Sequence, residues 1–121
     1  MTNEQIPSVP YHSVKIYIGG VHSIASVVCG EYCRKIGFCV NVTPTEYIYS
    51  GGQETGVIVE KINYARFPST IQEDCERMKE LADLLAERMN QRSYTITHNS
   101  RLLNGSSYHT VSMPCENNRK I

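Results

Sequence analysis

Four side chains that could hold a small molecule recur at every second residue near the middle of the chain. They are Thr43, Thr45, Tyr47 and Tyr49. Successive side chains of a strand alternate between its two faces, so these four would share one face. Hydroxyl groups can bind ribose or phosphate oxygens, and aromatic rings can stack on a base. The spacing predicts a strand face that holds a planar, polar ligand, provided that Pro44 leaves the alternation intact.

Three arginines and a phenylalanine extend this candidate ligand-binding set. Arg66 and Phe67 follow the next predicted strand, whereas Arg92 and Arg101 bracket a later one. The planar guanidinium group suits phosphate recognition, so we include all four residues. Contact with a second subunit is the alternative use of such a face, because tyrosine and arginine are also enriched at interfaces. A ligand site between subunits would satisfy both interpretations.

No catalytic template fits the chain, so the sequence predicts no catalytic residues. His98-Asn99-Ser100 supplies one of the two His-x-Ser/Thr motifs of a two-histidine phosphodiesterase, and His109 does not supply the other. The His-x-Glu motif of zinc deaminases and the Gly-x-Ser-x-Gly nucleophile elbow are absent. A Cys/His hydrolase stays open, because its catalytic partners need not be adjacent in sequence.

Two further motifs favour structural roles. Cys29 and Cys33 lie one helical turn apart, which is typical of packing and fits no zinc template. Gly19 and Gly20, before a helix that Ser23 could cap, would suit an anion. Their spacing matches neither the dinucleotide fingerprint nor the P-loop, so a tight turn is favoured. The sequence therefore predicts neither a metal ion nor a cofactor.

Composition is that of a single soluble domain. The chain has 121 residues, 40% hydrophobic residues and a formal net charge of zero. No basic stripe suggests binding to long nucleic acids, and no apolar run is long enough to span a membrane. Five cysteines without a signal peptide indicate reduced thiols in a cytosol. We expect a flexible arm at 1–12, one domain at 13–113 and a tail at 114–121.

Hydrophobic patterning predicts an α+β fold with the order β-α-β-β-α-β and one extra strand. Two helices would cover one face of an antiparallel sheet, in a ferredoxin-like arrangement or a Greek-key variant. The other face must then be solvated, bind something or pack on another subunit. The predicted helices cover 23–36 and 69–90, the second with a capping box at Ser69 and Gln72. The predicted strands cover 14–18, 38–49, 57–64, 93–97 and 108–113.

The block from Gly37 to Gly52, with the segment from Gly56 to Pro68, resembles a family of small phage proteins. The likeness extends over roughly residues 14–97, and we identify the family as phage anti-Thoeris proteins. This resemblance implies a protein that sequesters cyclic ADP-ribose signals, made by bacterial immune enzymes, without cleaving them. Some members also hold cyclic oligonucleotides. It further implies an oligomer with ligand sites between subunits, in the cytoplasm of the infected host.

Sequence and resemblance together predict a non-enzymatic binder of a cyclic nucleotide immune signal. Two alternatives remain open. One is a small phosphodiesterase or hydrolase that degrades such a signal with His98, His109 or a cysteine. The other is a structural or adaptor protein whose tyrosine-bearing face packs on a partner.

Overall fold

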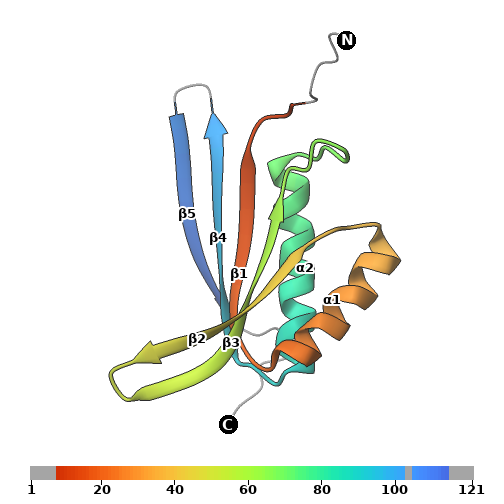
Figure 1. Ribbon diagram of the computed structural model, residues 1–121. Coiled ribbons are helices and arrows are strands. Elements are labelled where there is room, and N and C mark those ends of the chain that lie inside the picture. The colour runs from red at the N-terminus through yellow and green to blue at the C-terminus, as the bar shows by residue number, and fades with distance from the viewer. Residues whose placement is uncertain (1–7, 103–104, 115–121) are drawn as a thin grey trace, which may run out of the picture.

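Five strands and two helices make up the structure, a computed structural model that describes residues 8–102 and 105–114, with side chains as far as Asn99. Figure 1 shows them in chain order. They are β1 (His12–Gly19), α1 (His22–Ile36), β2 (Asn41–Tyr49), β3 (Gly52–Ile62), α2 (Ile71–Arg88), β4 (Ser93–Leu102) and β5 (Gly105–Pro114).

The strands form one antiparallel sheet in the order β2-β3-β1-β4-β5. α1 connects β1 to β2 past β3, and α2 connects β3 to β4 past β1. Both helices lie on the same side of the sheet (Figure 1). The predicted α+β class and element order are therefore confirmed. The strand order is the ferredoxin-like one, with β5 added at the edge beside β4.

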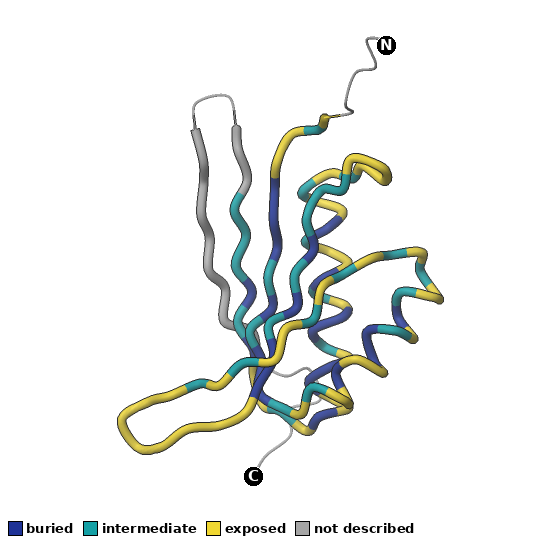
Figure 2. The backbone as a smooth tube through the Cα atoms, viewed as in Figure 1, coloured by how far each residue is buried: buried dark blue, intermediate teal, exposed yellow. Residues whose placement is uncertain are grey.

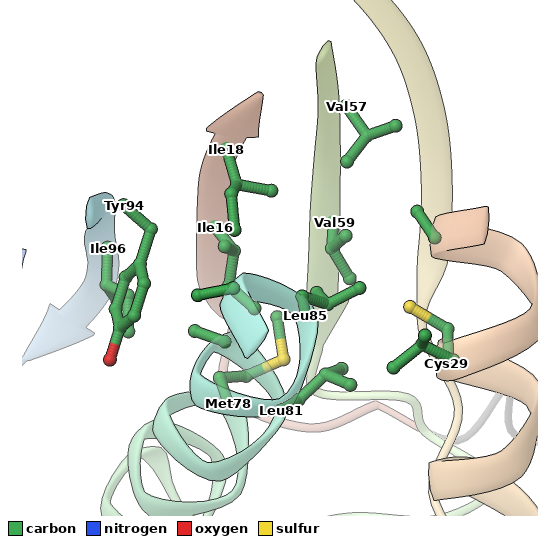
Figure 3. Packing of buried hydrophobic residues seen from close by; sticks show 14 of the residues in the cluster. Ile16, Ile18, Cys29, Val57, Val59, Met78, Leu81, Leu85, Tyr94 and Ile96 are labelled. Carbon is green, nitrogen blue, oxygen red and sulfur yellow. The ribbon is translucent and has the colours of Figure 1, made fainter. Parts of the chain in front are cut away.

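A single apolar core fills the space between the sheet and the helices (Figure 3). β1 contributes Val14, Ile16 and Ile18, since its even-numbered side chains face the helices. Each fully buried aliphatic side chain stabilises the fold by about 1.5–3 kcal/mol. α2 is the main helical contributor, because its stripe of Met78, Leu81, Ala82, Leu85 and Ala86 is wholly buried.

The N-termini of both helices differ from the predicted ones. Thr70, not Ser69, is the N-cap of α2, and it forms a capping box with Glu73. The Ser69 hydroxyl is directed instead to Asp74. α1 begins one residue earlier than predicted and has no side-chain cap, so Ser23 does not serve that role. Gly37 ends α1 in the left-handed conformation, as its position predicts.

Only part of the apolar surface of α1 is buried. Val28 and Tyr32 pack in the core as their helical spacing predicts, together with Ala25. Ile24 and Val27, which have helical spacing as well, are 42% and 54% exposed. The apolar surface of the helix is therefore wider than its buried face.

The β2–β3 hairpin is longer than predicted and extends beyond the body of the molecule. β3 begins at Gly52, so most of the expected turn at 50–56 is strand. Pro44 lies on the edge strand β2 and pairs in register with Val57 of β3. An edge strand is the part of a sheet where proline is tolerated. The hairpin end is exposed (Figure 2), and Ile48 is 74% exposed.

Candidate functional site

A groove lies at the end of the sheet where β1 ends, β4 begins and the hairpin extends outward. Its volume is about 530 Å³. Most of its side chains project from the sheet face that α1 and α2 leave uncovered. The name sheet groove is used below for this site, whose main lining side chains are Tyr17, Tyr47, Glu54, Gln91, Arg92 and Thr95.

Two glycines opposite each other lie beneath the side chains of the sheet groove. Gly19 of β1 pairs in register with Gly56 of β3. A Cβ atom at Gly56 would collide with the ring of Tyr47 and lie 2.7 Å from the carbonyl oxygen of Ile18. Glycine therefore lets the tyrosine ring lie flat against the sheet.

Tyr47 is held in place by its own hydroxyl group. The hydroxyl donates a hydrogen bond of 2.8 Å to the carbonyl oxygen of Val57. Burial raises the pKa of Tyr47, and a hydrogen bond with the backbone of Ile18 acts in the opposite direction. The side chain is therefore a neutral phenol at neutral pH. Its ring presents an aromatic surface to the groove near Tyr17 and Glu54.

Glu54 and Gln91 meet above the other glycine. A Cβ atom at Gly19 would collide with Glu54 Oε2 and lie 2.9 Å from Gln91 Oε1. Gln91 is brought there by the turn after α2, where its N–H donates 2.8 Å to the carbonyl oxygen of Ala86. Asn90 makes this turn with a φ of 58°. A carboxylate and an amide oxygen thus project together beside aromatic rings, which is an environment that attracts a cation.

Only part of the predicted ligand-binding set lies in the sheet groove. Tyr47 and Arg92 line it. Thr43, Thr45 and Tyr49 follow the predicted alternation on β2, opposite Ile58, Gly56 and Gly52.

The other predicted residues lie elsewhere. Arg66 and Phe67 follow the far end of β3, and Phe67 lines a different cavity. Arg101 belongs to β4, but its side chain lies outside the described residues.

Sequence reasoning missed four of the main lining residues: Tyr17, Glu54, Gln91 and Thr95. Glu54 was placed in a turn, and Gln91 follows a helix as an ordinary polar residue. The alternation of β1 could have identified Tyr17, which occupies the face opposite Ile16 and Ile18. Nothing in the local sequence could have shown that Gly19 lies beneath both polar side chains.

A second carboxylate lies on the same open face, nearer the other end of β3. Glu60 accepts a hydrogen bond of 2.7 Å from the Ser13 hydroxyl, and it faces Lys15 across the β1–β3 pair. Glu60 therefore already has a hydrogen-bond donor within the chain and a lysine opposite it in the sheet. Glu54 lies beside the aromatic rings of the groove, which makes it the better candidate for contact with a ligand.

Two solved structures have a similar fold. One is a phage SAM lyase in its apo state, with a TM-score of 0.65, 16% sequence identity, and coverage of 95% of this chain and 98% of that chain. The other is a phage SAM lyase in complex with S-methyl-5'-thioadenosine, with a TM-score of 0.63, 16% identity, and coverage of 96% and 98%. No family model and no curated protein matches the sequence. At this identity the likeness shows the fold.

This finding corrects the predicted function. Both similar structures, matched over nearly the whole of both chains, are SAM lyases, and this contradicts the prediction of a non-catalytic, sequestering protein. The similar structures are phage proteins, one of them with a small nucleoside ligand. This agrees with the resemblance as far as phage proteins that bind small molecules are concerned. Neither an anti-Thoeris role nor cyclic ADP-ribose has support in the comparisons. Within residues 8–102 and 105–114, no helix is long and apolar enough to cross a membrane.

Proposed function

We propose that the protein is a lyase that cleaves SAM (S-adenosylmethionine) in the sheet groove. The observation that carries the proposal is the near full-length match to a SAM lyase fold, one structure of which holds S-methyl-5'-thioadenosine. The groove, described independently of that match, has the chemistry that such a substrate requires. The proposal replaces the cyclic ADP-ribose ligand with a sulfonium nucleoside.

The groove residues complement the charged and planar parts of SAM. Its sulfonium centre is a cation, which the carboxylate of Glu54 and the faces of Tyr17 and Tyr47 attract. The exposed guanidinium of Arg92 suits the substrate carboxylate. Aromatic rings can also stack on adenine. The amide of Gln91 lies next to Glu54, where it can accept or donate a hydrogen bond to the amino-acid portion.

The proposed reaction breaks the bond between the sulfonium sulfur and the amino-acid chain. The electron pair of that bond remains on sulfur, which gives the neutral thioether S-methyl-5'-thioadenosine. The substrate's own carboxylate attacks the carbon that sulfur leaves, closing a lactone. The leaving group is neutral and the nucleophile is already ionised, so neither a general acid nor a general base is required. Holding the reacting atoms close together is the main task of the protein.

Incubation of the purified protein with SAM, followed by chromatography, tests the proposed function. We expect S-methyl-5'-thioadenosine to accumulate far beyond the protein concentration, with the lactone in equal amount at early times. SAM left intact after prolonged incubation would overturn the proposal. Homoserine formed at early times without lactone would point instead to the hydrolase alternative.

Gly19→Ala should strongly lower kcat/KM for SAM while it changes the stability of the fold comparatively little. The new methyl group would occupy the position of Glu54 Oε2 and crowd Gln91, both ends of flexible side chains that can move away. A shift of about 1 Å in a positioning group can cost about 100-fold in rate. The measurements are kcat/KM for SAM and the urea midpoint. Wild-type kcat/KM in a folded variant would contradict this arrangement of the groove.

Other features remain predictions. A homo-oligomer with ligand sites between subunits fits the exposed end of the β2–β3 hairpin, where Tyr49 is 55% exposed and lies on the same strand face as Tyr47. A second subunit that covered the groove would exclude water from it. A phage protein that consumes SAM in the host cytoplasm would deprive methyltransferases of their substrate, which is the route by which the predicted anti-defence role would follow.

A further inference from the structure

A second cavity lies at the opposite end of the molecule from the sheet groove. It has a volume of about 420 Å³ and lies where α1 ends and the loop after β3 leads into α2 (Figure 1). Lys61 and Glu54 are seven residues apart on β3, which places the two sites roughly 23 Å apart along the strand. The name loop cavity is used for this site, whose main lining residues are Phe38, Lys61, Tyr64, Phe67, Ser69 and Asp74.

The floor of the loop cavity is a fixed set of charged and polar groups. Asp74 Oδ2 lies 2.6 Å from His12 Nε2, 2.8 Å from the Ser69 hydroxyl and 3.1 Å from Lys61 Nζ. Lys61 also donates to the carbonyl oxygen of Ile62 at 2.7 Å and to Ser69 at 3.1 Å. The side chains of Lys61 and Asp74 are only 5% and 1% exposed. The ammonium group is therefore held in one place, with each of its three N–H groups bonded.

Aromatic rings stand around this ammonium group and extend to the mouth of the cavity. Lys61 Nζ lies 5.4 Å from the ring centroid of Phe38 and 5.3 Å from that of Tyr64. Burial raises the pKa of Tyr64 to about 12, so its ring stays neutral. Phe67 is 67% exposed, although it is the residue that brings a third ring to the cavity. An exposed phenylalanine at the mouth of an aromatic-lined cavity is available for stacking with a ligand.

A cation stands at the mouth as well. The guanidinium carbon of Arg66 lies 6.0 Å from the centroid of Phe67, and Arg66 is exposed. A ring placed against Phe67 would thus have Arg66 beside it and the aromatic walls and Lys61 on its inner side. This order of groups favours a flat, electron-rich ring inside and an anionic group at the mouth.

We propose that the loop cavity is a second ligand site, which takes a planar aromatic ring carrying an anionic group, as in a nucleoside monophosphate. The volume lies in the range of small-molecule sites. Its aromatic walls and fixed polar floor are preformed. Arg66 and Phe67, which the sequence indicates as phosphate-binding and base-stacking residues, then act together here and apart from the sheet groove.

Binding of AMP, measured by calorimetry on the full-length protein, tests this proposal. Phe67→Ala should weaken AMP binding by about tenfold, the usual loss for one stacking ring. Arg66→Gln should weaken AMP binding but leave the weaker binding of adenosine unchanged, because only AMP carries the phosphate. Both residues are exposed, so neither substitution should unfold the chain. Glu54→Gln is the matched control in the sheet groove and should leave AMP binding unchanged.

Three outcomes would overturn the second site. AMP that does not bind the wild-type protein leaves the cavity without its proposed ligand. Binding that is unchanged in both Phe67→Ala and Arg66→Gln places AMP elsewhere. Binding that is lost in Glu54→Gln and retained in Phe67→Ala places it in the sheet groove. Because SAM cleavage is measured separately, loss of one proposal leaves the other standing.

Discussion

Glu54→Gln should reduce kcat/KM for SAM by about 10-fold, the lower end of the loss of a contact to a charged group, because Glu54 is exposed. The carboxylate lies above Gly19 among the aromatic rings of the sheet groove, and glutamine keeps its shape while removing its charge. Because the sulfonium charge disappears as the bond breaks, a purely electrostatic role would raise KM more than it lowers kcat. The measurement is steady-state formation of S-methyl-5'-thioadenosine.

Glu60→Gln is the matched control for that experiment. Glu60 lies on the same strand and face, but Ser13 and Lys15 already accompany it. We expect its kcat/KM to stay within a few-fold of wild type. If Glu60→Gln lowered kcat/KM as much as Glu54→Gln, the catalytic site would have to extend along the open face of β3 as far as Glu60. If Glu54→Gln kept wild-type kcat/KM, the sheet groove would not be the site of cleavage.

Asp74→Ala should lower the free energy of unfolding by about 3–5 kcal/mol, the largest stability loss that we expect from a single polar residue. Asp74 is 1% exposed, and His12, Lys61 and Ser69 all direct polar atoms to its Oδ2. Removing the carboxylate leaves the buried ammonium of Lys61 without its counter-charge. Urea unfolding measures the effect, with SAM cleavage at low temperature as a check that the folded fraction remains active.

Asp83→Asn on the same helix is the control for Asp74→Ala. Asp83 also accepts two hydrogen bonds, from Lys79 and from the Tyr94 hydroxyl. Its side chain is 26% exposed, so water can replace part of what is lost. We expect a loss of about 1 kcal/mol. Equal losses of unfolding free energy in the two variants would show that the buried cluster around Asp74 stabilises the fold no more than the hydrogen bonds of Asp83 do.

The fold was predictable because its local signals agree with its global arrangement. The period of two in β1 and the stripe of α2 each identify one buried face, and two such faces define a sheet covered by helices. Errors occurred where the apolar surface of a helix is wider than its buried face. In α1 the predicted Val28 and Tyr32 are buried but Ile24 and Val27 are exposed, and only packing decides between them.

The site was only partly predictable, for a different reason. The alternation from Thr43 to Tyr49 follows from strand geometry alone, so Tyr47 could be identified from the sequence. Tyr47, Glu54 and Gln91 lie close together because β2, β3 and the turn after α2 meet at one end of the sheet. Arg66 is close to Tyr47 in sequence, yet the full length of β3 separates them. Proximity along the chain is a poor guide when a long strand intervenes.

The prediction of a non-catalytic protein failed on chemical grounds. Known templates supply an acid, a base or a nucleophile, and none of them fits this sequence. A substrate that carries its own leaving group and its own nucleophile asks for none of these groups. The absence of a template is therefore informative only about reactions that need one.

The facing pair of Gly19 and Gly56 has a further consequence for how substrate enters. The base of the groove, where the ring of Tyr47 lies over Gly56 and Glu54 lies over Gly19, rests on neighbouring strands about 4.8 Å apart. It cannot open or close as a loop-built lid does, because the hydrogen-bonded ladder around it would have to break. Association with substrate should accordingly be a single step, with a rate that depends on encounter and on salt and shows no slow closing phase in stopped-flow measurements.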